Sequence, residues 1–362
     1  MNAYQTRCKR AQEEMRRQGM DVLLVAPSSD LVYLTGIHTF ASERLAVFVL
    51  PASGDPLMVV PELEATMSRG KATFFELRMW TDGQDPYALL LAIAPAGAPR
   101  VGVTDQMMSG HLLRVQSALA NARFVLGSPV LTPLRQVKDA TEIAALRRSG
   151  AATDATMADL LSRPLVGRSE KEVGREINDL LLAHGHQQAG FGIVASGPNS
   201  GDPHRMNSDR TLQKGDSLVL DFGGVYDDYF SDITRSVFVG SPPEEYRRIY
   251  EVVQQAQEAA FRAVRPGMAC QEVDRAARRV IAAAGYGEYF IHRAGHGLGL
   301  DVHEEPYMVE GNAMPLEPGM VFSIEPGIYI PGRYGVRIED IVVVTESGGE
   351  RLNAAPRELR AL

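Results

Sequence analysis

The chain has 362 residues, of which 45% are hydrophobic and 23% are charged, and its formal net charge at pH 7 is -8. This length is enough for two globular domains, and the acidic balance argues against general binding to nucleic acid. No apolar run approaches the ~20 residues of a transmembrane helix, and the charged N-terminus lacks the apolar core of a signal peptide. We therefore expect a cytoplasmic protein that binds neither nucleic acid nor membrane. Its two cysteines, Cys8 and Cys270, are expected to be reduced thiols.

Strands and helices alternate in the first third of the chain. Strands are expected at 21–26, 44–50, 56–60, 100–103 and 124–126, and helices at 4–18, 62–70, 86–94 and 109–120. This alternation is typical of an α/β domain. Pro129 and Pro133 lie in a turn-rich stretch after the last strand. We place the domain boundary there and predict domains at 1–130 and 131–362.

The remainder of the chain repeats one order of elements. Two helices, at 140–161 and 169–185, precede a hairpin at 217–223 and 230–238, and two more, at 244–264 and 271–285, precede a hairpin at 321–330 and 335–344. No residue-by-residue repeat accompanies this order. The pattern predicts an α+β domain of two similar halves.

Each hairpin carries two acidic residues among apolar neighbours. If the first turn centres between residues 226 and 227, Asp221 lies opposite Asp232, and a second turn centred on residue 332 places Glu325 opposite Glu339. Directly opposed side chains have Cβ atoms about 5 Å apart, so two carboxylates in those positions repel each other unless a cation lies between them. The alternative is that each acid is a solubility charge on an edge strand. Two facing pairs in apolar hairpins favour the cation.

A histidine adds to this acidic set. His296 precedes the second hairpin in a glycine-rich segment, and neither cysteine lies near it in the sequence. Oxygen ligands with a single imidazole suit Mn²⁺, Co²⁺ or Zn²⁺. Four carboxylates and one histidine are enough to hold two divalent ions about 3.5 Å apart.

The motifs that carry these residues resemble those of the dinuclear pita-bread metallopeptidases of family M24, on the branch of Xaa-Pro dipeptidase (prolidase) and Xaa-Pro aminopeptidase. They read LDFGG, SDITR, HRAGHGLGLDVHEEP, FSIEPGIY and VRIED, and the resemblance covers essentially the whole chain. It implies a creatinase-like α/β N-terminal domain and an α+β pita-bread catalytic domain with pseudo-twofold symmetry. It also implies that Asp221 binds one metal ion, that Asp232 and Glu339 bridge both ions, and that His296 and Glu325 bind the second.

The resemblance implies roles for three further histidines. His204 would bind substrate, although its loop of turn-forming residues by itself favours a solvent-exposed histidine. His292 and His303, four residues before and seven after His296, would contact the substrate and the tetrahedral intermediate. Alternatively, these two imidazoles only orient metal ligands.

Parity along the second hairpin adds two more candidates. Tyr329 and Arg337 are an even number of residues from Glu325 and Glu339, so they share the face of those acids. Arg337 would hold the carboxylates in place and lower their pKa values, unless it forms an ordinary cross-strand pair. The predicted catalytic residues are Glu325, His204, His292, His303 and Arg337, and the predicted substrate-binding residues are His204, His292, His303, Tyr329 and Arg333. The remaining acids Asp227, Asp228, Asp301 and Asp340 are expected in turns or at the surface, and Arg235 on the opposite face.

The resemblance implies hydrolysis of Xaa-Pro bonds with two divalent ions, for which Mn²⁺ is expected and Co²⁺ or Zn²⁺ is possible. A hydroxide that bridges the ions would attack the scissile carbonyl, with His303 polarising its oxygen and Glu325 passing the proton to the leaving nitrogen. We expect a dipeptidase, with an Xaa-Pro aminopeptidase, a metal-dependent enzyme for another small substrate, and a non-catalytic peptide-binding or protein-binding module as alternatives.

A dipeptidase needs a cation for the substrate carboxylate. Arg333, at the tip of the second hairpin, and Arg293 are the candidates. The resemblance also implies a homodimer, in which segment 37–40 of one subunit closes the site of the other. The sequence leaves open the choice between dipeptides and longer peptides.

Overall fold

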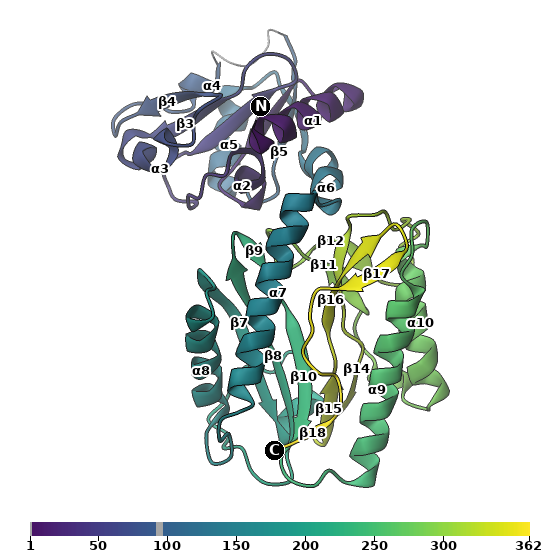
Figure 1. Ribbon diagram of the computed structural model, residues 1–362. Coiled ribbons are helices and arrows are strands. Elements are labelled where there is room, and N and C mark those ends of the chain that lie inside the picture. Colours follow the sequence, from purple (N-terminus) through teal and green to yellow (C-terminus); the bar gives the residue numbers. More distant parts are fainter. Residues whose placement is uncertain (1, 92–96) are drawn as a thin grey trace. The chain divides into compact units, whose positions relative to one another are not determined.

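The computed structural model describes residues 2–91 and 97–362, and the chain forms two compact units, Met1–Arg135 and Gln136–Leu362 (Figure 1). The predicted boundary, after residue 130, lies five residues earlier than this division. No helix among the described residues is long and apolar enough to cross a membrane. Cys8 and Cys270 are both buried free thiols.

The first unit is built on a six-stranded mixed sheet with the order β4-β3-β2-β1-β5-β6. Its strands are β1 Val22–Val25, β2 Val47–Pro51, β3 Leu57–Pro61, β4 Glu76–Trp80, β5 Arg100–Val103 and β6 Arg123–Leu126. Its helices are α1 Ala3–Gln18, α2 Ser29–Thr35, η1 Glu62–Glu64, α3 Ala65–Arg69, α4 Ala88–Leu91, α5 Ser109–Ala118 and α6 Ser128–Gln136. Strand β4 and helix α2 were not predicted. The end of the helix predicted at 86–94 lies outside the described residues.

Helix α6 corrects the turn predicted around its two prolines. Pro129 lies in the first turn, where a missing N–H costs no helical hydrogen bond. Pro133 lies inside the helix and has no N–H to donate to the carbonyl of Pro129. The Nε2 atom of Gln18 donates to that carbonyl instead, at 2.9 Å. A side chain from α1 therefore satisfies the group that the proline leaves without a partner.

The second unit contains the repeated elements. Its helices are α7 Ala140–Leu160, α8 Glu170–Ala183, η2 Gly197–Gly201, α9 Glu244–Ala263, α10 Cys270–Ala283 and η3 Gly287–Tyr289. Its strands are β7 Gln188–Ser196, β8 Ser217–Tyr226, β9 Tyr229–Phe230, β10 Ile233–Phe238, β11 Gly295–Gly297, β12 Glu304–Met308, β13 Val321–Ile324, β14 Gly327–Ile330, β15 Tyr334–Arg337, β16 Asp340–Thr345, β17 Gly348–Arg351 and β18 Arg360–Ala361. Strand β7 was not predicted.

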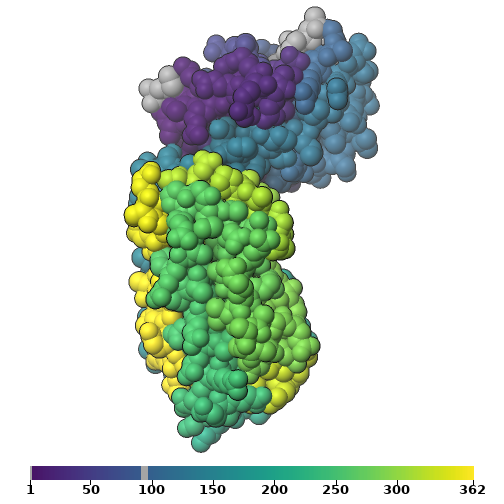
Figure 2. Space-filling view, turned by 90° about the vertical axis from the view of Figure 1, so that its right-hand side faces the viewer, coloured from purple at the N-terminus to yellow at the C-terminus, as the bar shows by residue number. Residues whose placement is uncertain are grey.

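Each half of this unit packs a pair of helices on its own strands. In Figure 1, α7 and α8 lie on one side of the strands and α9 and α10 on the other. In one half, apolar residues of α7 and α8 form a buried cluster with β8 and β10. In the other half, apolar residues of α9 and α10 form a second cluster with β13 to β16. The green surface of Figure 2 is the outer face of α9 and α10.

The sheets of the two halves are β18-β10-β8-β7, with β9 on β8, and β12-β11-β13-β16-β17, and β14 pairs with β15. One bridge, from Thr234 at β10 to Glu339 before β16, joins the first sheet to the second. The repeated order of helices and hairpin therefore brings the acidic segments of the two halves together.

The two hairpins differ in how well their register was predicted. In the second, Gly327 faces Arg337 and Ile324 faces Asp340, which is the predicted register. In the first, Asp221 faces Thr234 rather than Asp232, so that prediction is wrong by two residues. The reason is the turn at Asp227 and Asp228, which both have positive φ (49° and 70°). A two-residue turn of this kind lies one residue later than assumed, and a shift of two positions in pairing keeps Asp232 on the same face.

Candidate active site

The acidic segments surround a cavity of about 700 Å³ in the second unit. Nine of the predicted site residues line it: His204, Asp221, Asp232, His292, His296, His303, Glu325, Arg337 and Glu339. Three of the acids lie where regular pairing stops. Asp232 precedes β10, Glu325 follows β13, and Glu339 precedes β16.

Three buried carboxylates in this cavity each have one oxygen without a hydrogen-bond partner. These oxygens are Asp221 Oδ1, Asp232 Oδ1 and Glu339 Oε1, and no other buried carboxylate oxygen in the described residues is in this state. The second oxygen of Asp221 accepts from Arg337, and that of Glu339 accepts from Thr234 Oγ1 at 2.7 Å. Buried polar groups normally have partners, so these free oxygens fit ligands of a cation.

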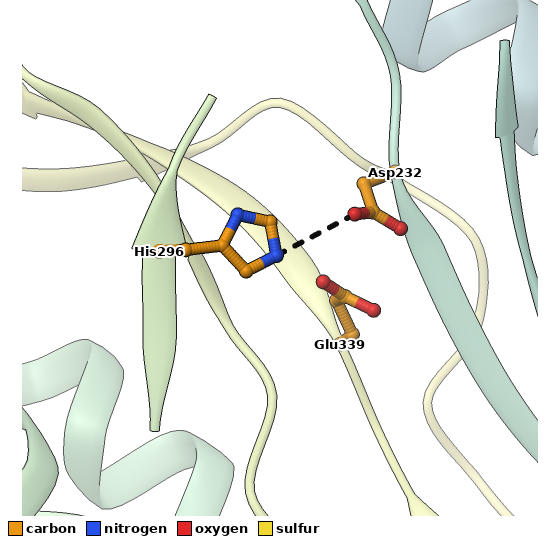
Figure 3. Close-up of side chains that lie close together, drawn as sticks. All are labelled: Asp232, His296 and Glu339. Atoms are coloured by element: carbon orange, nitrogen blue, oxygen red, sulfur yellow. Dashed lines mark ion pairs between the residues drawn. The ribbon is translucent and has the colours of Figure 1, made fainter. Parts of the chain in front are cut away.

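His296 lies beside these acids with the tautomer of a metal ligand. Its Nδ1 atom is 3.1 Å from the carbonyl of Gly297 and must donate there, which leaves the lone pair of Nε2 free. Nε2 lies 3.7 Å from Asp232 Oδ2 and 3.4 Å from Glu325 Oε1. Ligand atoms of Asp232, His296 and Glu339 all lie within 4.8 Å of one another (Figure 3). The donor set, carboxylate oxygens with one imidazole, fits divalent ions such as Mn²⁺ or Zn²⁺.

Burial and mutual repulsion set the protonation of this cluster. Burial, followed by the charge of Glu339, raises the pKa of Asp232 well above its usual value. Burial, followed by the charge of Glu325, does the same for the pKa of Glu339. Arg337 lowers both pKa values, as predicted, but burial and repulsion outweigh it. Burial lowers the pKa of His296 to about 4, so its imidazole is neutral at physiological pH.

Arg337 is the centre of a buried hydrogen-bond network. Its guanidinium donates to Asp221, to Thr234 Oγ1 at 3.0 Å and to the hydroxyl of Tyr329 at 2.7 Å. That hydroxyl lies 3.0 Å from Nε2 of His292. Since arginine only donates, the Tyr329 O–H is left to donate to His292. Burial lowers the pKa of His292 and so favours the neutral ring that accepts this bond.

The other two predicted site histidines, His204 and His303, also line the cavity. His204 and His303 are exposed, and no hydrogen bond to either ring occurs within the described residues. The ring of His303 lies edge-on to that of His296, with centroids 4.0 Å apart. Both imidazoles therefore have nitrogen atoms free for a substrate, whereas both nitrogens of His292 have partners in the chain.

Two predicted substrate-binding residues do not line the cavity. Arg333 lies at the hairpin tip with 52% of its side chain exposed, and its guanidinium forms an ion pair with Glu245. This position does not support Arg333 as the cation for a substrate carboxylate. Tyr329 is buried behind His292 and Arg337 and acts on them rather than on the cavity. Arg293 lines the cavity, and its guanidinium carbon lies 4.1 Å from the centre of the Tyr307 ring.

Asp340 was expected in a turn or at the surface, and the structure shows that this prediction is wrong. It is 0% exposed, and its carboxylate binds Arg235 at 2.7 Å, Arg357 at 3.2 Å and Arg351 at 3.3 Å. Arg235 in turn donates to the carbonyl of Glu339 at 2.6 Å. The pair therefore holds the backbone of a predicted metal ligand. The contacts of Arg235 with Asp340 and Glu339 join residues about a hundred positions apart, so no local pattern indicated them.

Sequence reasoning also missed the groups that hold the acids and the apolar wall of the cavity. Ser323 Oγ donates to Glu325 Oε1 at 3.2 Å and accepts from the backbone N–H of His296 at 3.0 Å. The apolar lining residues are Phe191, Ile193, Phe230 and Val302. Alternation along β7 would have indicated the first two, had that strand been predicted.

Known proteins resemble the chain over its whole length. Residues 7–137 match the creatinase/prolidase N-terminal domain, and residues 144–346 match metallopeptidase family M24. The chain is 48% identical to the probable dipeptidase PepE of Mycobacterium tuberculosis over 345 residues, which cover 94% of this chain and 92% of the relative. It is 33% identical to the Xaa-Pro dipeptidase of Pyrococcus horikoshii over 360 residues, which cover 99% and 100%. A prolidase structure from Thermococcus sibiricus matches with a TM-score of 0.95 and 39% identity, and the match covers 100% of both chains.

The fold and the site define a metal-dependent hydrolase with a creatinase-type N-terminal domain and a pita-bread catalytic domain. The chain belongs to metallopeptidase family M24. The predicted family and fold class are confirmed. Membership implies an enzyme that uses divalent metal ions, and the free carboxylate oxygens beside His296 fit them.

Proposed function

We propose that this enzyme hydrolyses Xaa-Pro dipeptides with two divalent metal ions, for which Mn²⁺ is the expected metal. The observation that carries the proposal is the set of three buried carboxylate oxygens without partners beside the free Nε2 of His296. Relatives named dipeptidase and Xaa-Pro dipeptidase, similar over almost the whole chain, support the substrate class.

We assign the metal ligands as Asp221, Asp232, His296, Glu325 and Glu339. The protein holds three of these five ligands from behind, with Arg337 on Asp221, Thr234 on Glu339 and Ser323 on Glu325. Such outer partners orient ligands and keep the correct oxygen free. When bound, the ions would polarise the scissile carbonyl and lower the pKa of a water molecule toward neutrality.

Glu325 has the position and chemistry of the proton carrier. It is partly exposed to the cavity, whereas Asp232 and Glu339 are buried. In the proposed reaction, Glu325 accepts a proton from the attacking water and donates it to the proline nitrogen. Proline nitrogen must be protonated to leave, so this transfer completes bond cleavage.

The exposed histidines are proposed to bind the substrate. The free ring nitrogens of His303 and His204 would contact the scissile carbonyl oxygen and the peptide, respectively. A donor at the carbonyl oxygen stabilises the charge that develops there during attack. His292 supports this side of the cavity through Tyr329, because its two ring nitrogens are already hydrogen bonded.

Arg293 is proposed to bind the free carboxylate of a dipeptide. It lines the cavity, and no carboxylate in the described part of the chain forms an ion pair with it. Stacking on Tyr307 holds the guanidinium and leaves its N–H groups in plane for a carboxylate. A longer peptide has an amide at this place and lacks the charge, so Arg293 favours the dipeptide.

The proposed specificity is tested by kcat/KM for Ala-Pro, Ala-Pro-Ala and a longer Xaa-Pro peptide. We expect the dipeptide to be the best substrate, and Arg293→Met to raise its KM by about tenfold or more through loss of a charge-assisted hydrogen bond. Arg333→Met is the matched control and should leave KM unchanged, since Arg333 lies outside the cavity. Equal or better cleavage of the longer peptides would make the enzyme an Xaa-Pro aminopeptidase.

We further propose a cytoplasmic homodimer, with segment 37–40 of one subunit near the site of the other. Phe40 in this segment is 62% exposed, which supports a contact surface there. Sedimentation equilibrium tests the proposal, and Phe40→Asp should shift the protein toward monomer. A monomeric wild-type protein would contradict it.

A further inference from the structure

A buried carboxylate outside the metal cluster is held by neutral donors, and the guanidinium of Arg210 lies one hydrogen bond away, on the hydroxyl of Ser196. Glu170, the first residue of α8, is 0% exposed, and no lysine, arginine or histidine in the described residues forms an ion pair with it. Its partners are five neutral donor groups instead. They are the backbone N–H and hydroxyl of Ser196, the side-chain amide of Asn199, and the backbone N–H and hydroxyl of Ser208.

These donors lie at the two ends of one loop, residues 196–208. Oε1 accepts from Ser196 N–H at 2.8 Å and from its hydroxyl at 2.7 Å. Oε2 accepts from Ser208 N–H at 3.0 Å and from its hydroxyl at 2.6 Å. Asn199 contacts both oxygens, at 3.0 and 3.2 Å. One oxygen thus holds the start of the loop and the other holds its end.

Glu170 binds the two ends of the loop as a charged carboxylate. Burial raises the pKa of Glu170, but the hydrogen bonds from Ser208, Ser196 and Asn199 outweigh burial and bring that pKa below its usual value. The residue also lies in the first turn of α8, where the helix dipole favours a negative charge. The ionised carboxylate can accept from all five donors, because it has no O–H group that would face them.

The loop between these ends carries His204 to the cavity. The ring of His204 has no hydrogen bond within the described residues, so the backbone of the loop alone determines its place. Next to it, the carbonyl of Pro203 accepts from Arg337 at 3.3 Å. The tip of the loop therefore meets the network around Asp221, while its base meets Glu170.

We propose that Glu170 is a positioning residue for substrate binding, which fixes both ends of loop 196–208 so that His204 lies at the cavity. Glu170 does not itself touch the substrate. The inference rests on the proposed function, because it takes His204 as a substrate-binding residue.

Two measurements on Glu170→Gln test the proposal. The amide replaces one acceptor oxygen by a donor that faces other donors, so one end of the loop is released. Arg205 in the loop is exposed, and trypsin should cleave after it faster in the variant than in the wild type. The KM for Ala-Pro should rise by about tenfold while kcat changes by less than about threefold, because lost substrate binding appears in KM.

Glu172→Gln is the matched control, since Glu172 lies in the same turn of α8, is exposed and contacts Ser169 rather than the loop. It should change neither cleavage nor KM. A purely structural defect would lower the active fraction, and so kcat, without raising KM. In a His204→Ala background, Glu170→Gln should raise KM no further. If Glu170→Gln does not fold, Ser208→Ala removes one of the five donors and should act in the same direction with a smaller effect.

Unchanged cleavage at Arg205 in Glu170→Gln would overturn the anchoring of the loop. Faster cleavage with an unchanged KM, or an equal rise in KM in the His204→Ala background, would overturn the role in substrate binding. A wild-type enzyme that does not hydrolyse Xaa-Pro peptides would instead overturn the proposed function, and the rate of cleavage at Arg205 would still decide whether Glu170 anchors the loop.

Discussion

Arg337 determines how the first metal ligand is presented to the cavity. Its guanidinium contacts Asp221, Thr234, Tyr329 and the carbonyl of Pro203 from a fully enclosed position. These four partners lie in different directions around a planar group with five donors. A lysine ammonium at this site would have the charge but not the geometry.

We therefore expect Arg337→Lys to fold and to lose activity. The value of kcat/KM for Ala-Pro should fall by about a hundredfold, because Asp221 and Tyr329 lose their fixed partners. Steady-state kinetics with far-UV circular dichroism as the control for folding measure this effect. Activity within threefold of the wild type would mean that charge alone is required.

The proposed contact of His303 with the carbonyl oxygen can be tested by a single substitution. Because its ring nitrogens are free, its contact with the substrate should strengthen as the carbonyl oxygen becomes negatively charged. His303→Ala should lower kcat by about a hundredfold or more and raise KM much less. The converse result, a rise in KM with kcat unchanged, would make His303 a residue that binds the ground state only.

Glu325→Gln should keep the fold and abolish hydrolysis. The amide preserves the shape of the side chain but removes the proton carrier and one metal-binding charge. Turnover within tenfold of the wild type would contradict the assignment of Glu325. Its bond with Ser323 explains why the fold should survive, since Gln also accepts through its carbonyl oxygen.

Among the secondary-structure elements, the buried Asp340 joins two strands, β10 and β17, to helix α9 and to the C-terminal segment. It contacts Arg235 on β10, Gln257 on α9, Arg351 on β17 and the following Arg357. Removing its charge would leave the buried guanidinium of Arg235 without an ion pair, whereas Arg351 keeps its pair with Glu258. The three elements and the backbone of Glu339 would all lose a fixed partner.

Asp340→Asn should accordingly destabilise the fold by about 3 kcal/mol or more. Urea unfolding monitored by circular dichroism measures the change in free energy. Asp179→Asn, at an exposed position of α8, is the control for removal of a negative charge and should change stability far less. A loss below about 1 kcal/mol in Asp340→Asn would show that the arginines find other partners.

The same elements show what could be predicted from the sequence. Two apolar hairpins with acids of matching parity were visible, as was the turn at Gly332, because these depend on neighbours in the chain. The turn was placed one residue too early, because the residue types alone did not show that Asp227 and Asp228 both enter the left-handed region. The Asp340 cluster, the bonds of Glu170 and the helical state of Pro133 depend on contacts between distant segments. No local pattern contains them.

At the scale of the whole molecule, the cluster of acids makes stability depend on pH and metal. Without metal, Asp232 and Glu339 have raised pKa values, so the folded chain binds protons more tightly than the unfolded chain. Their contribution to stability is present below the ordinary carboxyl pKa of about 4 and is lost as pH rises through the raised values. Metal ions must displace these protons, so metal binding should release protons and strengthen as pH rises.

We therefore expect the rise in Tm caused by Mn²⁺ to be larger at about pH 8 than at about pH 6. Differential scanning calorimetry of the metal-free protein, with and without Mn²⁺, measures both values. The double variant Asp232→Asn and Glu339→Gln is the control, and its Tm should be nearly independent of Mn²⁺. An equal shift at both pH values in the wild type would contradict the coupling of protons to metal.

The proposed metal dependence is tested by titrating the metal-free enzyme with Mn²⁺ while following hydrolysis of Ala-Pro. This metal dependence predicts no activity after chelation, and activity that rises with added Mn²⁺ to a plateau at two bound ions per chain, as counted by elemental analysis after removal of free metal. Hydrolysis that is indifferent to chelation, or a protein that binds Mn²⁺ but never cleaves Ala-Pro, would contradict it.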